Sequence, residues 1–511
     1  MSTIRELCEP LATHRKVVWT LALAVLGSYA YFVPAPAWNQ NSRFALTRAL
    51  VERGSTNIDP DHETTGDKSF REGHFYCDKA PGASLLAVVP YAVFHGLRGL
   101  AGGELPGVSV IPLDPRDAKA GRAPSIAERK PGDRLLYNRA HRLGLYFSSV
   151  FSVGLLSVLG VLALWLLALR QGAGHVGTAS VCALTYGLAT PAFAYSTALY
   201  GHQSCGALLL IAFAILVLVS RRTAARSVGL VLGTALGLAV SIEYTAAVPA
   251  AVLAVWWLTK QGFVATAWMG LGAAPWALAL AVYHTVAFGH PLSTGYDWVW
   301  LPEFAEGMRV NYGIGRPDPQ ALLAITFGAY RGLFYVAPVL LLAVWGLLRG
   351  VWPRANDREV GMLTDGAPAR IATALCAYYL LLNAGYYMWD GGAAIGPRHV
   401  VPMLGLLCLG LARARGMVPH AFATLAVVSA AQLLLATAAM PEAPQHGNPL
   451  WEFALGHVLG RDASTDAIAS NLGLLLGLSG GWSLLPLLGL WAWAWPITRE
   501  TARASEAPGQ G

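Results

Sequence analysis

The stretch "GHFYCDKAPGASLLAVVPYAVFHGLRGL", residues 73–100, decides how the chain is threaded through a membrane. Its second half, residues 82–100, is apolar enough to resemble a membrane span. Its first half carries His74, Asp78 and Lys79 directly before that run. If residues 82–100 cross the bilayer, every later loop changes sides. If they lie on the membrane surface, the charged residues before them belong to one large loop on the outer side.

The composition places most of the chain in lipid. Of its 511 residues, 55% are hydrophobic and 13% are charged, whereas a soluble domain carries about 25% charged residues. The first apolar run lacks a small-residue cleavage site, so we expect a retained span rather than a signal peptide. The six cysteines are scattered without a CxxC pair, which indicates neither a disulfide framework nor a zinc knuckle. The basic residues form no tract with interleaved aromatic residues, so no nucleic-acid partner is expected.

The hydrophobic pattern predicts an all-α integral membrane protein with about 12 transmembrane helices (about 11–13), residues 82–100 not counted. The expected spans are 17–34, 143–169, 175–197, 204–220, 227–242, 245–259, 263–286, 331–348, 370–388, 399–412, 417–440 and 471–496. The expected parts of the chain are a cytoplasmic N-terminus (1–16), the first transmembrane helix (17–34), a large external loop (35–142), a transmembrane domain (143–496) with external loops near 287–330, 389–398 and 441–470, and a cytoplasmic tail (497–511).

The distribution of basic residues decides the orientation. With the N-terminus inside, the cytoplasmic segments hold sixteen Lys and Arg and the shorter external segments hold five. Because Lys and Arg concentrate in short cytoplasmic loops, a span at 82–100 would place clusters such as Arg221-Arg222 on the wrong side. Pro90 in mid-run also favours a helix lying in the interface. We therefore expect a multi-pass protein of a bacterial-type inner (plasma) membrane, with its active site on the external, periplasmic side.

The external loop concentrates residues that carry acid–base and phosphate chemistry. A surface helix is expected within 39–60, ended by Gly54. The residues that follow include Asp59, Asp61, His62, Glu63, Asp67, Lys68, His74, Asp78 and Lys79. Carboxylates and imidazoles at a membrane face serve as bases, and lysines meet phosphate as point charges. A solvated surface loop is the alternative, but the position between a span and an interfacial helix favours a functional site.

Later external segments repeat this chemistry. The candidate residues are His202 in "YGHQS", Asp297 in an aromatic-rich loop, Arg331 at the mouth of a span, and Arg398 and His399 after a glycine-rich stretch. Glu243 in "SIEYTA" lies where two apolar runs meet, so it is either a turn residue or a buried acid. The arginine fork suits phosphate oxygens. The alternative for these residues is a helix cap or an anchor at the lipid headgroups.

In these features the chain resembles the GT-C superfamily of polytopic glycosyltransferases, and most of all its branch of protein O-mannosyltransferases and lipid A aminoarabinose transferases. The resemblance covers the whole architecture: a long first external loop with two surface helices, a dozen or so spans, and an active site at the outer face. The family pattern of an acidic residue, Lys, any residue and Pro stands here as "YCDKAPG", so Asp78, Lys79 and Pro81 match. The pattern Asp-Glu-x-Arg-Tyr stands as "QNSRF", in which Arg43 and Phe44 fit.

The acidic positions of that second pattern hold Gln40 and Asn41, although the resemblance implies a catalytic base at the first of them. An amide does not accept a proton, so either another carboxylate has taken the role, or the substrate needs none, or the protein is inactive. We favour Asp59 and then Asp61, because neither has an adjacent cation. Asp78 is the alternative.

The resemblance implies a polyprenyl-phosphate sugar as donor, with its phosphate held by Lys79, Arg331 and Arg398. Some members of the superfamily place a divalent metal ion beside the acid that precedes the lysine, which is Asp78 here. No other cofactor is implied. Partners are then the lipid bilayer, the donor, and an acceptor of the cell envelope, which is a protein, a glycan or a lipid.

Three functions are compatible with these features. The first is an inverting transfer of one sugar from polyprenyl phosphate to an acceptor at the outer face. The second is a transporter or flippase of lipid-linked saccharides, which would be expected to show inverted repeats and charges at the bilayer midplane. The third is a scaffold without chemistry. The informative charges lie at one face and no internal repeat is evident, so the sequence favours a glycosyltransferase.

Overall fold

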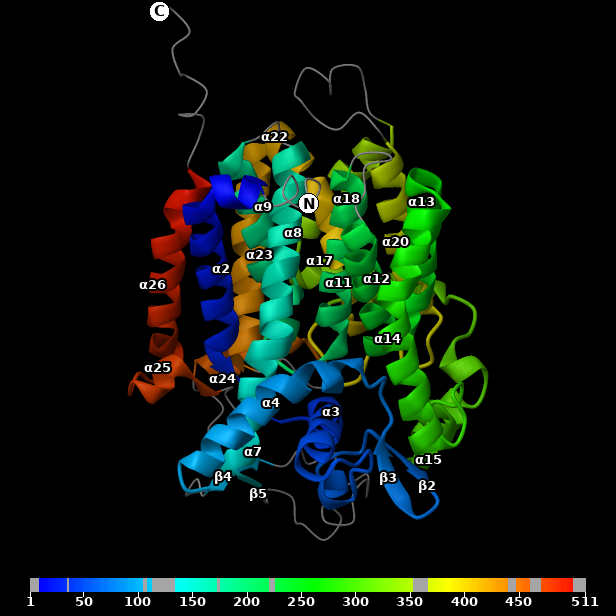
Figure 1. Cartoon of the computed structure of the whole chain (residues 1–511). Coiled ribbons are helices and arrows are strands. Elements are labelled where there is room, and N and C mark those ends of the chain that lie inside the picture. The colour runs from blue at the N-terminus through cyan, green and yellow to red at the C-terminus, as the bar shows by residue number, and fades with distance from the viewer. Residues whose placement is uncertain are drawn as a thin grey trace, which may run out of the picture.

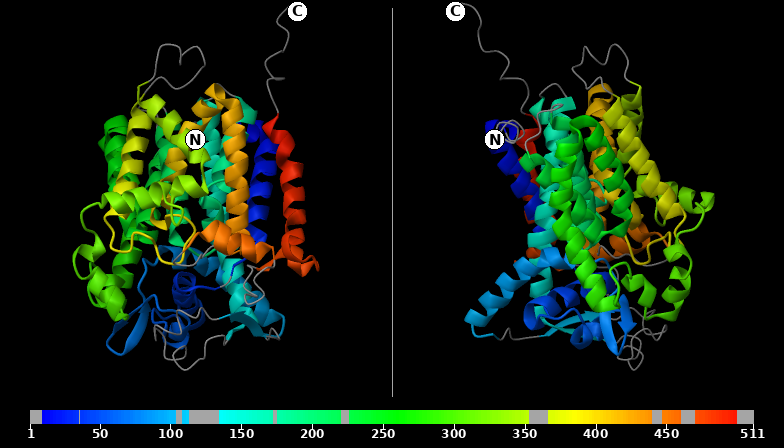
Figure 2. Two further views of the ribbon diagram at one scale, coloured as in Figure 1. Left: turned by 180° about the vertical axis from the view of Figure 1, so that it is seen from behind. Right: turned by 45° about the vertical axis from the view of Figure 1, so that its right-hand side comes forward.

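The computed structural model describes residues 9–34, 36–103, 108–112, 134–171, 175–219, 226–352, 366–439, 447–459 and 470–499. Its helices form a bundle, and the residues after the first helix form a layer across one end of that bundle (Figure 1). The first bundle helix begins at the opposite end, where the last one also ends (Figure 2). The predicted all-α architecture is confirmed, and a long segment follows the first helix. We call the layer that this segment forms the external layer, after the side on which the sequence predicts it.

The bundle consists of apolar helices. They are α2 (Arg15–Ala30), α8 (Leu155–Gln171), α9 (Val176–Leu188), α11 (Gly201–Leu218), α12 (Arg226–Ile242), α13 (Ala247–Gln261), α14 (Phe263–Phe288), α18 (Val339–Val351), α20 (Ala367–Ala384), α23 (Pro419–Ala439) and α26 (Leu485–Ala494). Shorter helices extend or connect them: α7 (Arg139–Ser149), α10 (Ala192–Ser196), α15 (Pro302–Met308), α16 (Pro319–Phe327), α17 (Leu333–Val336), α21 (Leu404–Leu407), α22 (Leu411–Met417), α24 (Leu455–Val458) and α25 (Leu472–Leu475).

Among the described residues, six helical segments are long and apolar enough to cross a membrane by length and composition. They are Gly82–Leu100, Arg139–Gln171, Gly201–Leu218, Phe263–Phe288, Arg398–Met417 and Pro419–Ala439. Three shorter apolar helices are α9, α12 and α18. The count of twelve spans therefore stays a prediction. The expected span 471–496 is wrong at its start, because Ser470–Asn471 form strand β6 and the helical turns that lead into α26 begin at Gly480.

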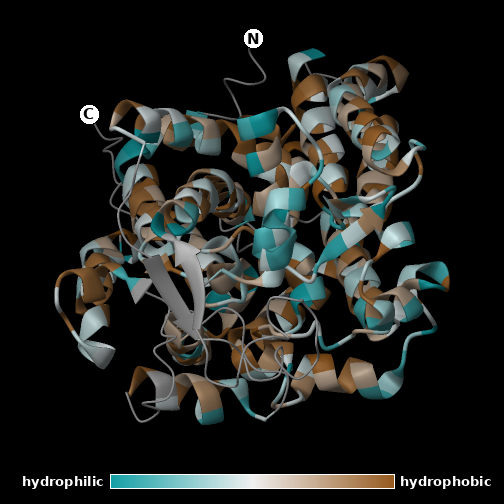
Figure 3. Ribbon diagram, turned by 90° about the horizontal axis from the view of Figure 1, so that it is seen from below, coloured by the Kyte–Doolittle hydropathy of each residue, from teal (hydrophilic) through white to brown (hydrophobic). Residues whose placement is uncertain are grey.

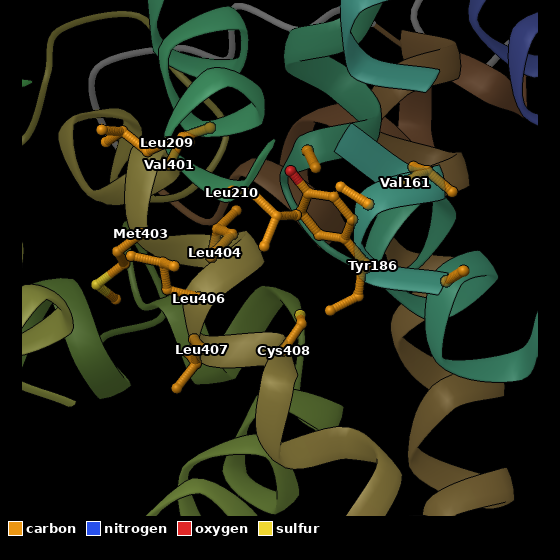
Figure 4. Packing of buried hydrophobic residues seen from close by; sticks show 14 of the residues in the cluster. Val161, Tyr186, Leu209, Leu210, Val401, Met403, Leu404, Leu406, Leu407 and Cys408 are labelled. Atoms are coloured by element: carbon orange, nitrogen blue, oxygen red, sulfur yellow. The ribbon is translucent and has the colours of Figure 1, made fainter. Parts of the chain in front are cut away.

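Close packing at the centre of the bundle depends on glycine. α11 is mostly buried, whereas most residues of α14 are half-buried or exposed. A Cβ atom at Gly206 of α11 would lie 3.0 Å from Pro402 Cα in the 3-10 turn Arg398–Met403, so the two backbones approach directly. Leu210 of α11 lies there beside Leu404 and Tyr186 of α9, and Leu209 lies near Val401 (Figure 4).

The external layer is built from a helix and a hairpin. α3 (Trp38–Arg48) continues into a π-helical turn (Ala49–Arg53), and Gly54 ends it in the left-handed region with a φ of 62°. Strands β2 (Lys68–Arg71) and β3 (His74–Cys77) pair antiparallel, with Lys68 opposite Cys77. Glu72 and Gly73 make the turn with φ angles of 50° and 87°, as a two-residue hairpin requires.

Two further antiparallel strand pairs lie outside the hairpin. Strand β1 (Phe32–Val33) pairs with β6 (Ser470–Asn471), which joins the end of the first span to the segment before α26. Strand β4 (Val108–Pro112) pairs with β5 (Arg134–Asn138), directly before α7.

The apolar half of the stretch 73–100 forms α4 (Gly82–Leu100), which lies across the end of the bundle instead of along it (Figure 1). Val89, Val93, Leu97 and Leu100 are 72%, 49%, 58% and 88% exposed and follow one another at helical spacing. Such an unpaired apolar face suits a helix that lies in the lipid headgroup region. Seen from this end, hydrophilic residues occupy much of the external layer and hydrophobic ones line the helices around it (Figure 3).

The orientation of α4 is tested by thiol labelling. In a Cys8→Ser background, cysteines at Glu72 and at Gly103 flank α4 at exposed positions. Both are expected to react with a membrane-impermeant maleimide added from outside, because a surface helix leaves its two ends on the same side. A cysteine at Trp352, after α18, is the control and is expected to stay unlabelled until the membrane is permeabilised. Opposite labelling of the first two positions would mean that α4 spans.

Candidate active site

The external layer meets the bundle at a buried ion pair. Arg43 of α3 is 2% exposed, and its Nη2 lies 3.3 Å from Glu243 Oε1, between α12 and α13. Arg43 Nε donates to Asn39 Oδ1 at 3.1 Å, and Nη1 donates to the carbonyl of Ala80 at 3.3 Å. One guanidinium therefore joins α3, the segment before α4 and the bundle.

Lys79 lies between two carboxylates beside this pair. Its Nζ is 3.0 Å from Asp78 Oδ2 and 3.3 Å from Asp67 Oδ2. Burial raises the pKa of Asp78 to about 6, and the positive charge of Lys79 limits that rise. Burial alone would lower the pKa of Lys79, but Asp67 and Asp78 raise it well above its usual value. Lys79 thus stays charged at neutral pH.

Two histidines and an arginine complete the group. His202, at the start of α11, places Nδ1 3.3 Å from Glu243 Oε1. Its ring lies edge-on to that of His399, with 5.4 Å between centroids. Among the described residues, buried Asp78 Oδ1, His202 Nε2, Arg398 Nε and His399 Nε2 have no hydrogen-bond partner. These four atoms come from three distant parts of the sequence, and unpaired buried polar atoms at one place are typical of a ligand site.

The packing of α11 explains why these residues meet. Gly206 of α11 contacts Pro402 of the 3-10 turn. His202 lies four residues before Gly206, and Arg398 lies four residues before Pro402, in each case about one helical turn. Both side chains therefore emerge at the same end of the bundle. Gly391 supports Arg398 from the other side: its φ is 72°, and a Cβ atom there would lie 3.0 Å from Arg398 Cγ.

Tyrosines from two external loops border the group. Burial raises the pKa of Tyr296, and the charge of Lys79 opposes that rise. Burial also raises the pKa of Tyr386, which Lys79 and Arg398 both oppose. The two cations therefore act on the same phenol, whose ring lies 5.1 Å from that of His399.

Arg331, which was expected to hold phosphate, donates to carbonyl oxygens of the protein. It is fully buried, and its Nη2 and Nε donate to the carbonyls of Gly392 at 2.6 Å and Asp390 at 3.0 Å. Its Nη1 donates to the carbonyl of Tyr330 at 3.3 Å. Because all three nitrogens bind protein oxygens, Arg331 holds the glycine-rich loop that carries Arg398.

A second group of predicted residues lies on the hairpin side of the external layer. His74 Nδ1 is 2.7 Å from Asp59 Oδ2, and the amide of Phe75 donates to Asp59 Oδ1 at 2.7 Å. Lys68 Nζ donates to the carbonyl of His62 at 2.7 Å and lies 3.2 Å from the Nδ1 atom of the His62 ring. Burial lowers the pKa of Lys68 to about 8, and burial and Lys68 lower the pKa of His62. Glu63 is exposed beside them.

Asp59 and Asp61 were expected as bases because neither has an adjacent cation in sequence, but both carboxylates have partners in the structure. Asp61 forms an ion pair with Arg48 of α3, thirteen residues away in sequence. Asp59 is held by His74 and by a backbone amide. Both carboxylates belong to the hairpin group rather than to the junction with the bundle.

The remaining predicted and substituted positions have local roles. Asp297 accepts a hydrogen bond from the amide of Thr294 at 2.7 Å and caps a 3-10 turn, Gly295–Trp298. Gln40 and Asn41 are fully buried in α3, where Asn41 Nδ2 donates to the carbonyl of Thr64 at 2.9 Å. Asn41 therefore fastens α3 to the loop that follows it.

The carboxylate that joins both halves of the site, Glu243, was not among the predicted site residues. Its signal was present, because an acid between two apolar runs is either a turn residue or a functional group. What was missing was its partner Arg43, two hundred residues earlier.

The donor atoms present do not fit a divalent metal at Asp78. Within the described part of the chain, no three His, Cys, Asp or Glu side chains converge as metal ligands. Lys79 Nζ already occupies the space between Asp78 and Asp67 where a cation would bind.

Comparison with known proteins gives solved structures alone, since no family model and no curated protein matches the chain. ArnT from Cupriavidus metallidurans is similar in its apo state (15% identity, 95% of this chain, 74% of that chain, TM-score 0.47). It is also similar when bound to undecaprenyl phosphate (14%, 96%, 74%, 0.49). The third is the Archaeoglobus fulgidus oligosaccharyltransferase in the apo form (13%, 98%, 61%, 0.42). Both proteins are GT-C glycosyltransferases, the superfamily that the sequence resembles. At TM-scores below 0.5, the case for a function rests on the geometry of the site.

The raised pKa of Asp78 predicts a pH dependence of stability. The pKa of the Asp78 carboxyl is about 6 in the folded protein, whereas in the unfolded chain it has its ordinary pKa of 3.8. The stabilisation is therefore complete below about pH 4 and is lost as the pH rises through 6. Asp78→Asn removes the titration, so the melting temperature of the wild type should fall relative to this variant between pH 4 and pH 7. The assignment would be contradicted if the melting temperatures of the wild type and of Asp78→Asn changed in parallel over that pH range.

Proposed function

We propose that the protein is a membrane glycosyltransferase that transfers a sugar from a polyprenyl-phosphate donor to an acceptor at the outer face. The observation that carries the proposal is the group of buried polar atoms, on Asp78, His202, Arg398 and His399, that have no partner among the described residues and lie where the external layer meets the bundle. A lipid-linked phosphate needs cations at the membrane boundary, with apolar surface beside them for the lipid. Lys79 supplies a cation, and α4, which begins three residues after it, carries the exposed apolar side chains Val89 and Val93.

Lys79 and Arg398 are the proposed ligands of the donor phosphate. Lys79 is aligned by two carboxylates, so little side-chain freedom is lost when it binds. Arg398 keeps a buried Nε without a partner among the described residues, and an arginine fork matches two phosphate oxygens. We propose that Arg331 acts indirectly, by holding the loop on which Arg398 stands.

The proposed transfer follows from this placement. As the bond between the sugar and the phosphate breaks, negative charge grows on the phosphate oxygens. Cations fixed in a site of low dielectric stabilise that charge more strongly than water does, and they need no reorganisation. Of the three carboxylates expected as bases, only Asp78 lies at the junction. Its Oδ2 is engaged by Lys79, so its proposed role is to hold that lysine.

We propose a separate role for the hairpin group. Asp59, His62 and His74 present an acid and two imidazoles on the external layer, away from the junction, and buried Lys68 donates to the carbonyl of His62 beneath them. Exposed Phe70, Trp298 and Trp300 lie near them. These side chains suit contact with the acceptor rather than with the donor phosphate.

Transfer is tested directly with purified protein. Incubation with radiolabelled polyprenyl-phosphate sugars and cell-envelope fractions should release free polyprenyl phosphate and label an acceptor. A flippase would move the labelled lipid across proteoliposomes without releasing polyprenyl phosphate. Release that requires the envelope fraction supports the proposal, and transbilayer movement without release would replace it by transport.

Donor binding tests the cationic site. Lys79→Ala and Arg398→Ala each remove a charge-assisted hydrogen bond, which costs about 1.5–3 kcal/mol, or about ten- to a hundredfold in affinity. Arg309→Ala is the matched control, because this arginine is exposed on the same side and pairs with Glu306. Fluorescence or calorimetric titration with the lipid phosphate measures the change. Equal affinity in all three variants would make Lys79 and Arg398 structural anchors.

A further inference from the structure

We propose that His202, oriented by Glu243, accepts the proton of the acceptor hydroxyl in place of the carboxylate that the resemblance puts at position 40. This inference rests on the proposed function and adds to it the residue that activates the acceptor. It answers the difficulty that Gln40 does not accept a proton.

The geometry of His202 is that of a base held by a carboxylate. Its side chain is buried, with Nδ1 3.3 Å from Glu243 Oε1. A carboxylate only accepts hydrogen bonds, so the proton of the neutral imidazole is assigned to Nδ1 and the lone pair to Nε2. That Nε2 has no partner among the described residues. The ring nitrogen that accepts protons is therefore the one left available.

Another buried histidine shows what a structural role looks like. His284, at the end of α14, uses both nitrogens: Nε2 is 2.8 Å from Tyr244 Oη, and Nδ1 is 3.1 Å from the carbonyl of Pro291. His284 is as buried as His202. Full use of both nitrogens is the expected state of a histidine that only supports the fold, and His202 departs from it.

The charged groups around His202 support this role. Arg43 faces it from α3, Lys79 from the segment before α4, and Arg398 and His399 from the turn that packs on α11. Glu243 is the acid in direct contact. Burial first, and then these positive charges, favour a neutral imidazole, the form that accepts a proton. A bound phosphate offsets these charges, so donor binding would increase the basicity of His202.

The proposed step transfers one glycosyl group and one proton. The acceptor hydroxyl oxygen attacks the anomeric carbon and forms the new glycosidic bond. The bond from that carbon to the phosphate oxygen breaks, and polyprenyl phosphate leaves with the electron pair. The hydroxyl proton moves to His202 Nε2, and the resulting imidazolium faces Glu243. Release of this proton to solvent restores the enzyme.

Asp78 is less suited to the same task. Its carboxylate aligns Lys79, the proposed phosphate ligand. Protonation of Asp78 would weaken that ion pair at the moment when charge grows on the leaving phosphate. Protonation of His202 instead places a new positive charge beside the same phosphate. The second arrangement stabilises the transition state, and the first one does not.

The test compares four variants for turnover, donor affinity and pH profile. His202→Gln should lower turnover by about 10²–10⁴, keep donor affinity within about threefold, and remove the acidic limb of the pH–rate profile. Glu243→Gln should lower turnover less and move the acidic limb to lower pH, because the imidazolium loses its carboxylate. This shift distinguishes a positioning residue from one that only supports the fold.

His284→Gln is the matched control, since it removes a buried histidine from the same face. Its turnover per folded molecule and its pH profile should match the wild type. Asp78→Asn should change donor affinity more than the pH profile. Retained donor affinity in the His202 and Glu243 variants shows that they are folded.

Two results would overturn the inference. Full turnover of His202→Gln, with turnover lost in Asp78→Asn, would assign the base to Asp78 and leave the glycosyl transfer intact. Loss of donor affinity in His202→Gln would make the histidine a phosphate ligand. Absence of transfer by the wild type is a different outcome, because it contradicts the proposed function itself.

Discussion

The buried ion pair between Arg43 and Glu243 is the contact on which the external layer and the candidate site both depend. Removing one partner of a buried pair leaves an uncompensated charge and costs about 3–5 kcal/mol. Arg43 also holds Asn39 and the carbonyl of Ala80, so the start of α4 is fixed by the same group. Since Glu243 also faces His202, the position of the layer and the orientation of that imidazole are set by one carboxylate.

Backbone contact within the bundle supplies the second constraint. The segment from Arg398 to Met417 alternates short helical and 3-10 turns, and it lies against α11 where Gly206 and Gly405 leave room. Larger residues there would push the turn outward and carry Arg398 with it. On the external side, three donors of Arg331 fix the loop that ends at Arg398. The glycines thus determine how closely the turn that carries Arg398 approaches α11. Arg331 fixes the position of the loop before that turn.

The sequence predicted the bundle well because membrane spans are local. About 20 apolar residues in a row identify a span whatever it packs against, and the hairpin turn at Glu72 and Gly73 is equally local. The site was predicted only in part, because its contacts join distant positions. Sequence adjacency made Asp61 look free of cations, but its partner Arg48 lies thirteen residues earlier, at the end of α3. The role of Glu243 required knowing that α3 docks on the corner between α12 and α13.

A charge balance argues that the base of the proposed reaction belongs at the junction. Arg43, Lys79 and Arg398 face the carboxylates Asp67, Asp78 and Glu243, so the formal charges cancel before the donor binds. A phosphodiester brings one negative charge and leaves as a monoester with two. If the proton stays within the group, the added imidazolium charge offsets the second one, and the net charge of the buried site does not change. A proton taken by Asp59 or Asp61 on the hairpin would leave that charge uncompensated in a medium of low dielectric, where such a change is costly.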